Sequence, residues 1–248
     1  MRLQEKTAIV TGGASGFGAG IVRKFVAEGA QVMIADLNTA LAQDLCQEMG
    51  AHAIVASVDV ADGASVLAMA VQAIEAWGHI DILVNNAGIT HLPAPMETVT
   101  EDDFDRVFAV NCKSVYLTAR HIVPLMKARG HGNILNIAST AGVSPRPNLS
   151  WYNASKGWMN TATKGMAVEL APIGVRVNAL NPVAGETPLL RSFMGEDTPQ
   201  MRAKFISTIP LGRFSTPEDM GNAACYLCSD EASMITGVCM EVDGGRCI

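Results

Sequence analysis

Tyr152 and Lys156 stand four residues apart in a segment with a helical pattern. Side chains at this spacing share one face of a helix. An ordinary phenol has a pKa near ~10 and is a poor base at neutral pH, but an ammonium group one turn away favours the phenolate and lowers that pKa. A tyrosine tuned in this way takes a proton from an alcohol or gives one to a carbonyl oxygen. An exposed pair on a helix surface would have the same spacing, so the interpretation depends on the rest of the chain.

A glycine-rich turn near the start of the chain has the pattern of a phosphate cradle. The run Ala8–Val10 predicts a buried strand, and a helical pattern follows the turn as far as Gly29. Glycines allow the backbone to approach a ligand closely, and a helix N-terminus favours the charge of a pyrophosphate. A plain tight turn is the alternative. The turn consists of Thr11, Gly12, Gly13, Ala14, Ser15, Gly16, Phe17 and Gly18.

Asp36 ends the next predicted strand, which begins at Gln31. An acid about ~20 residues beyond the glycines accepts hydrogen bonds from a ribose 2′-hydroxyl and repels a 2′-phosphate. No arginine or lysine occurs from Asp36 to Thr39 to neutralise such a phosphate. The sequence therefore favours NAD over NADP as the cofactor. Helix capping by Asp36 is the alternative, although Asn38 is the better candidate for the cap.

Polar residues also follow the ends of other predicted strands. Asp59 comes after the strand 53–58, and we expect it either to reach an adenine or to cap the next helix. Asn86 follows the strand 80–84 and needs a partner for its amide, either a cofactor or backbone. Ser139 follows the strand 133–137, and Pro182 follows the strand 175–180.

Three helices after residue 100 contribute further expectations. A long helical pattern runs from about Glu101 to Arg129 and contains Asn111. Asparagine has poor helix propensity, and such a local cost often marks a functional residue; a core amide bonded to backbone is the alternative. Ser150 is the expected N-cap of the helix that carries Tyr152, and Thr216 is the expected N-cap of the last helix.

Strands and helices alternate along the whole chain, and a last strand covers 238–242. This alternation predicts an α/β fold, a doubly wound parallel sheet of about seven strands with helices on both faces. Ligands bind such a sheet beyond the carboxyl ends of its strands, so the polar candidates are expected to meet at one edge. We expect one domain, 1–248, with a mobile substrate flap at about 184–213 that holds one or two short helices.

In combination, these motifs resemble the classical short-chain dehydrogenase/reductase family over nearly the whole chain. The turn T-G-x-x-x-G-x-G, the run N-N-A-G, a mid-helix Asn, a Ser thirteen residues before the Tyr, Y-x-x-x-K and a late V-D-G-G occur in order. The resemblance implies a single-domain Rossmann-type fold, a nicotinamide cofactor and usually a homotetramer.

Carried over by position, the resemblance also implies roles for single residues. Tyr152 would be the general acid/base, Ser139 would hold the substrate oxygen, and Lys156 would bind the nicotinamide ribose and lower the tyrosine pKa. Asn111 would hold a water in a proton relay that reaches Lys156. The expected cofactor contacts are Gly12, Ser15, Gly16, Phe17, Gly18, Asp36, Leu37, Asp59, Val60, Asn86, Ala87, Gly88, Tyr152, Lys156, Pro182, Val183, Gly185 and Thr187.

Two positions depart from the family pattern. After the sixth strand the family commonly reads P-G-x-x-x-T, whereas this chain has Val183 where the glycine is usual and a glycine at Gly185 instead. Thr187 keeps its place and is expected to bond the carboxamide. Phe17 stands where a smaller aliphatic residue is usual. The first departure puts the backbone route near the nicotinamide in question, whereas a cradle built from backbone tolerates Phe17.

The resemblance implies an NAD(H)-dependent oxidoreductase that interconverts a secondary alcohol and a ketone by hydride transfer. Three alternatives are a 3-oxoacyl-(acyl-carrier-protein) reductase-like ketoreductase, a dehydratase or epimerase on the same fold, and a non-redox cofactor-binding protein. The first usually prefers NADP, so Asp36 counts against it. The small-molecule substrate is a sugar, a polyol, a hydroxy acid or a cyclic alcohol. Its expected pocket includes His91, Thr140, Arg146, Trp151 and Leu189, with Arg191 nearby.

Composition excludes several other classes of protein. The 248 residues are 49% hydrophobic, enough for a sizeable core, and the net charge of −6 argues against nucleic acid as a partner. We see no polybasic run, secretory pattern or long apolar stretch, and therefore expect a cytoplasmic protein without a membrane partner. Cys225 and Cys228 form a lone C-x-x-C without a second pair or nearby histidines, so we expect no metal site.

Overall fold

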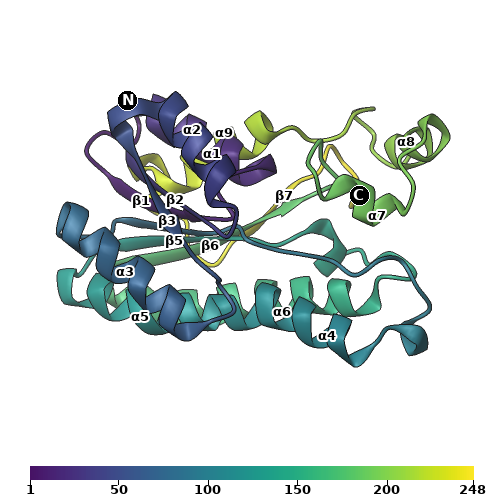
Figure 1. Ribbon diagram of the computed structural model, residues 1–248, viewed down its shortest axis with the longest axis horizontal. Coiled ribbons are helices and arrows are strands. Elements are labelled where there is room, and N and C mark those ends of the chain that lie inside the picture. Colours follow the sequence, from purple (N-terminus) through teal and green to yellow (C-terminus); the bar gives the residue numbers. More distant parts are fainter.

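The computed structural model describes residues 1–248 and is built around a seven-stranded parallel sheet (Figure 1). The strand order is β3-β2-β1-β4-β5-β6-β7, so the chain builds outward from β1 in one direction and then from β4 in the other. This order confirms the predicted doubly wound α/β sheet. The strands are β1 Thr7–Thr11, β2 Gln31–Asp36, β3 Ala53–Ser57, β4 Ile82–Asn85, β5 Gly132–Ile137, β6 Val175–Pro182 and β7 Cys239–Val242.

Helices cover both faces of the sheet. In Figure 1, α1, α2 and α9 lie on one face, and α3, α5 and α6 lie on the other. The two short helices α7 and α8 follow β6 and lie beyond its carboxyl end. The helices are α1 Gly16–Ala27, α2 Thr39–Met49, α3 Gly63–Trp77, α4 Glu101–Phe108, α5 Ser114–Arg129, α6 Ser150–Leu170, α7 Leu190–Met194, α8 Pro199–Ile206 and α9 Pro217–Cys228.

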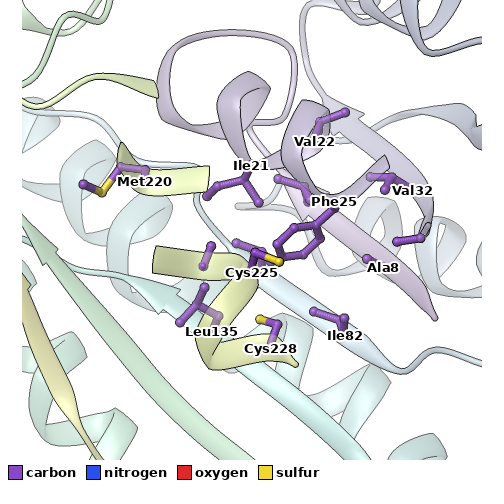
Figure 2. Packing of buried hydrophobic residues seen from close by; sticks show 14 of the residues in the cluster. Ala8, Ile21, Val22, Phe25, Val32, Ile82, Leu135, Met220, Cys225 and Cys228 are labelled. Carbon is purple, nitrogen blue, oxygen red and sulfur yellow. The ribbon is translucent and has the colours of Figure 1, made fainter. Parts of the chain in front are cut away.

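The apolar core consists of one large cluster on each face of the sheet. Because both faces are covered, the central strands are buried along their whole length and read as continuous apolar runs. Figure 2 shows Phe25 of α1 packed among residues of the strands and of α9. Cys225 and Cys228 of α9 belong to this same cluster, and no group of three or more His, Cys, Asp or Glu in the structure could hold a metal ion.

Parallel register brings the carboxyl ends of the strands to one edge. Val10 pairs with Val84, which pairs in turn with Leu135. One strand further on, Ile137 pairs with Leu180. The residues that follow β1, β4, β5 and β6 therefore lie at the same end of the sheet, although they are far apart in the sequence.

The long helix predicted from Glu101 to Arg129 is wrong in one respect, because a π-helical segment, Ala109–Lys113, separates α4 from α5. Asn111 lies in the middle of this segment, and its side chain turns inward to bond the backbone of Ile89. The wider turn also leaves the Val110 carbonyl to accept a hydrogen bond from Ser114. π-helical turns occur frequently at functional sites.

Local capping explains where several helices begin. Asn38 caps α2 by accepting the Leu41 N–H, and Thr216 forms a reciprocal capping box with Asp219. The prediction for Ser150 is wrong: Leu149 occupies the N-cap position, Ser150 is already helical, and no side chain caps this helix.

The segment after β6 folds back over the edge of the sheet. Val183, Leu190 of α7 and Phe214 belong to a small buried cluster of their own. This cluster attaches the segment to the end of β6, because Val183 follows the strand directly.

No helix in the structure is long and apolar enough to span a membrane.

Candidate active site

A cavity of about 360 Å³ lies at the carboxyl edge of the sheet, and its size falls in the range of small-molecule sites. It runs from the glycine turn after β1, past the ends of β4, β5 and β6, to the segment around α7. The sequence-predicted residues that line it are Gly12, Ser15, Gly16, Phe17, Asp36, Asn86, Ala87, Gly88, Ser139, Thr140, Arg146, Tyr152, Lys156, Pro182, Val183, Gly185, Thr187 and Leu189.

The glycine turn packs directly against the chain that follows β4. Gly12 has a φ of +60°, and a Cβ there would lie 2.9 Å from the Cα of Ala87. A Cβ on Gly18 would lie 2.1 Å from the carbonyl oxygen of Gly12, so this glycine allows α1 to begin against the turn. Ser15 is the N-cap of α1 but makes no side-chain capping bond. The first N–H groups of α1 therefore lack a side-chain partner, which suits the binding of a phosphate.

Asn86 joins the ends of β1 and β4. Its Nδ2 donates to the carbonyl oxygens of Thr11 and Gly12, at 2.9 Å each. The Thr11 hydroxyl in turn accepts the N–H groups of Asn86 and Ala87. The Asn86 amide nitrogen is thus satisfied by backbone, and its role is to hold the floor of the cavity in place.

Asp36 lies at the same edge, next to the glycine turn. Its carboxylate accepts the Ala14 N–H at 3.0 Å and the Asn38 N–H at 2.9 Å. No cationic side chain contacts it, and it is the only acidic residue that lines the cavity. The site therefore carries a negative charge beside the turn without a positive charge that would compensate a further phosphate.

Tyr152 lies in the first turn of α6 and is buried, with 5% of its surface exposed. Burial raises the pKa of its phenol to about 12, and a hydrogen bond with Ser139 acts in the opposite direction. Ser139 itself is positioned by the Ala141 N–H, which donates to its Oγ at 3.1 Å. The two hydroxyl groups that the sequence predicted to act on one substrate oxygen therefore lie together.

Lys156 lies one turn further along α6 and is also buried. Its Nζ donates to the Ile137 carbonyl oxygen at 2.8 Å and lies 6.0 Å from the centre of the Tyr152 ring. Burial lowers the pKa of this ammonium to about 8. Because Lys156 bonds to a carbonyl group and forms no ion pair with an acidic side chain, its charge remains available for a ligand in the cavity.

Asn111 does not line the cavity but lies directly behind it. A Cβ on Gly88 would lie 3.3 Å from Lys156 Nζ and 3.5 Å from Asn111 Oδ1. The Asn111 amide also donates to Ser155 Oγ at 3.0 Å. A glycine at position 88 thus leaves the space in which Asn111 and Lys156 approach each other.

The two departures from the family pattern meet in space. A Cβ on Gly185 would lie 2.2 Å from the Cζ atom of Phe17. Gly185 also pairs with Ser215 in an isolated bridge, and Val183 is buried under α7. The glycine at 185 therefore makes room for the large side chain at 17, and the valine at 183 attaches the segment after β6.

Several sequence-predicted residues lie away from the cavity wall. Leu37 is exposed, and Val60 is buried beneath β3 in the core of that face. Asp59 accepts the Ala61 N–H, while Asp62 caps α3, so the capping alternative for Asp59 is wrong. These residues remain predicted cofactor contacts, with Asp59 at the adenine, and so does Gly18, whose backbone supports the turn.

Two predicted substrate-pocket residues, His91 and Trp151, also do not line the cavity. His91 is buried, its Nδ1 lies 2.8 Å from the Leu92 carbonyl oxygen, and its Nε2 has no partner. The Trp151 indole donates to the Met96 carbonyl oxygen, and its ring packs edge-on against Phe104. Arg191 is exposed on α7 and does not line the cavity either.

Sequence reasoning expected the pocket in the stretches 140–151 and after Thr187, but it did not single out several residues of the apolar wall. Phe193 of α7 packs edge-on against the Tyr152 ring, with centroids 5.0 Å apart. Leu149 is buried beside the same tyrosine. Neither residue lies in a periodic pattern that points to a site, since Leu149 is in an irregular loop and Phe193 is in a five-residue helix. The remaining missed residues of the wall are Ile137, Ala138, Ala141, Ala184 and Pro188.

Comparison with known proteins agrees with this geometry. A family model described as enoyl-(acyl carrier protein) reductase matches residues 12–246. A 4-formylbenzenesulfonate dehydrogenase of Comamonas testosteroni is 51% identical over 250 residues, which cover 99% of each chain. A 2-dehydro-3-deoxy-L-rhamnonate dehydrogenase (NAD(+)) of Sphingomonas sp. (strain SKA58) is 38% identical over 246 residues, which cover 99% of this chain and 96% of the relative.

A solved structure extends the comparison to three dimensions. The crystal structure of a 3-ketoacyl-(acyl-carrier-protein) reductase from Brucella melitensis, complexed with NADH, superposes with a TM-score of 0.95 at 48% identity, covering 99% of this chain and 100% of the other. The likeness therefore includes every strand end that forms the cavity. The chain is an NAD-dependent oxidoreductase that acts on alcohol CH–OH groups or the corresponding carbonyls, and it belongs to the classical short-chain dehydrogenase/reductase family.

Proposed function

We propose that Tyr152 is the general acid/base of this oxidoreductase and that Ser139 holds the substrate oxygen beside it. The observation that carries the proposal is that the hydroxyl-bearing side chains of Tyr152 and Ser139 line the same cavity, with the Lys156 ammonium 6.0 Å from the Tyr152 ring. A substrate hydroxyl held by both groups is placed to give its proton to Tyr152 during oxidation, and a carbonyl oxygen to receive one during reduction. NAD, when bound, would accept the hydride that leaves the alcohol carbon, and NADH would return it to the carbonyl carbon during reduction.

The positive charges around Tyr152 make this proton transfer feasible at neutral pH. A phenol with a pKa of about 12 is protonated at neutral pH and cannot take up the substrate proton. The phenolate therefore needs stabilisation when the site is filled. Lys156 is mostly protonated at neutral pH with a pKa of about 8, and the positive charge of an oxidised nicotinamide would add to it. Asn111 and Lys156 both lie next to Gly88. There Asn111 would hold a water that passes the proton from Tyr152 on to solvent.

For the cofactor, Ser15 and the start of α1 bind the pyrophosphate, and Lys156 binds the nicotinamide ribose. Asp36 accepts the hydroxyls of the other ribose and selects NAD over NADP, because no cation contacts it and a 2′-phosphate would be repelled. Thr187, which lines the cavity close to Gly16, bonds the carboxamide of the nicotinamide.

The segment 184–213 acts as the substrate flap of this single domain, since Leu189 and Phe193 cover the cavity from above Tyr152. The substrate is a small alcohol or ketone, and the relatives are named for an aryl sulfonate, a sugar acid and a 3-ketoacyl-(acyl-carrier-protein). The homotetramer that the family resemblance implies and the cytoplasmic location expected from the composition complete the proposal.

The experiment that tests the proposed function measures NADH formation from NAD across secondary alcohols, sugars and hydroxy acids, with Tyr152→Phe assayed in parallel. Turnover that disappears in the variant supports the assignment. Acyl thioesters in the reverse direction test the ketoreductase alternative that the Brucella structure suggests. Turnover that survives in Tyr152→Phe contradicts the role of the tyrosine, and bound NADH without turnover of any compound favours a non-redox binding protein.

A further inference from the structure

Arg146 is a positive charge in the cavity wall that has no negative partner. Among the lining residues only Arg146 and Lys156 are cationic, and the one acid, Asp36, lies beside the glycine turn at the end of β2. The side chain of Arg146 forms no ion pair and no hydrogen bond within the protein; its closest recorded partner is the ring of Phe205, 4.4 Å from the guanidinium carbon. A half-buried guanidinium without a counter-charge is costly, which indicates that a ligand supplies the charge.

A second arginine strengthens the positive potential at this place. Arg246, in the segment after β7, donates to the hydroxyl of Ser144 at 3.4 Å, and its Nε is buried without a partner. The charge of Arg246, together with burial, lowers the pKa of Arg146. Asp243 forms no ion pair with either arginine; its carboxylate accepts the N–H groups of Gly245 and Cys247.

The backbone holds Arg146 in a fixed position. Pro145 and Pro147 flank it, so its own conformation is restricted to the extended region. Its carbonyl oxygen accepts Asn153 Nδ2 at 2.7 Å, which ties the loop to α6 next to Tyr152. Binding to a side chain placed in advance loses little conformational entropy, and this favours a specific contact.

Apolar side chains line the cavity wall that also holds Arg146 and the reacting hydroxyl groups. Leu149 and Phe193 belong to this wall, and Phe193 packs against the Tyr152 ring. A ligand that reaches both ends therefore carries an apolar body, with its oxygen at Tyr152 and its charge at Arg146.

We propose that Arg146, supported by Arg246, binds the carboxylate or sulfonate of the substrate, and that an apolar ring connects this group to the carbon that reacts at Tyr152. This inference rests on the proposed function and adds a specificity-determining residue to it. Arg guanidinium groups bind such planar or tetrahedral oxyanions through paired hydrogen bonds, which a lysine cannot reproduce in full.

The test compares ketones that have the same shape but differ in charge. NADH-dependent reduction is measured for 4-acetylbenzenesulfonate and its neutral sulfonamide, and for 4-acetylbenzoate and its neutral amide. Arg146→Met should lower kcat/KM for the anions by about 10- to 100-fold, mostly through KM, and change it for the neutral ketones by less than about threefold. Arg146→Lys should lie between. The two anions show whether a sulfonate or a carboxylate fits better.

Arg120→Met is the matched control, because Arg120 is exposed on α5 and does not line the cavity; its kinetics should follow the wild type. An equal loss for charged and neutral ketones in Arg146→Met, or no loss for either, overturns the proposal, as does a wild type that neither binds nor reduces the anions. Calorimetric binding of 4-acetylbenzenesulfonate to the NADH complex tests the anion site separately from the proposed function. Binding that depends on Arg146 without reduction of any ketone overturns the proposed function and leaves the anion site standing.

Discussion

The side-chain amide of Asn111 forms two hydrogen bonds with the backbone of Ile89, donating to its carbonyl oxygen and accepting its N–H, both at 2.9 Å. The two residues lie 22 positions apart, and the contact fixes the chain after β4 against the π-helical segment. Gly88, the residue before Ile89, lines the cavity, so this pair determines where the cavity wall stands.

Asn111→Ala should destabilise the protein by about 2 kcal/mol, because both backbone groups of Ile89 lose a partner in a partly buried place. The measurement is urea unfolding of the cofactor-free protein. Asn38→Ala removes an exposed helix cap of the same residue type and should cost about 1 kcal/mol. Equal costs for the two variants would contradict a special role of the Ile89 contact.

Tyr152→Phe should lower turnover by about 10²- to 10⁴-fold, the range for loss of a positioned general acid/base, and leave NADH affinity within about twofold. Steady-state kinetics and NADH fluorescence titration measure the two effects. Tyr116→Phe is the control, since Tyr116 is exposed on α5. A Tyr152→Phe protein that binds NADH poorly would show that the phenol acts in cofactor binding instead.

Lys156→Met should raise the free energy of unfolding of the cofactor-free protein at neutral pH. Burial lowers the pKa of Lys156 from 10.5 to about 8, so the unfolded chain binds the extra proton between these pH values and stability rises with pH there. Below about pH 8 the ammonium is charged in both states, and its burial costs about 3 kcal/mol.

The advantage of Lys156→Met over the wild type should therefore shrink as the pH rises from about 7 toward 10. Urea unfolding at several pH values tests this, in proteins that both carry Cys112→Ser, because Lys156 lowers the pKa of that thiol; the difference between them then isolates the lysine. Lys164→Met, exposed on the same helix, is the control and should show no such trend. An advantage that grows with pH would contradict the assignment.

Asp36→Ala should reduce the preference for NAD over NADP by at least about tenfold in kcat/KM, because the repulsion of a 2′-phosphate and the acceptor for the ribose hydroxyls are lost together. The ratio is measured with both cofactors at saturating substrate. Asp44→Ala removes an equal charge from the exposed face of α2 and should leave the ratio unchanged. A ratio that does not move in Asp36→Ala would assign the preference to other residues.

Most of the fold could be predicted because each strand reads as a buried apolar run bounded by turns. Parallel register then places Gly12, Asn86, Ser139 and Pro182 at one edge without further information. The π-helical segment could not be predicted, since it depends on the long-range contact between Asn111 and Ile89. Phe193 and the inward position of Arg146 depend in the same way on how the segment after β6 packs onto the loop before α6.

Trp151 shows why nearness in sequence is a poor guide inside a helix. It precedes the tyrosine directly, yet successive helical residues point about ~100° apart. Its indole therefore bonds to Met96 on the other side of α6, outside the cavity.

The contact between Phe17 and Gly185 constrains the order in which substitutions at these two positions can occur. A side chain at 185 is obstructed while the phenylalanine is present, and the phenylalanine is accommodated only while 185 is bare. A route between the family pattern and this chain therefore passes through the state with a small residue at 17 and glycine at 185, and the reverse order leads through an overfilled intermediate. Grafting the segment after β6 from a relative into this chain will succeed only together with its partner in the glycine turn.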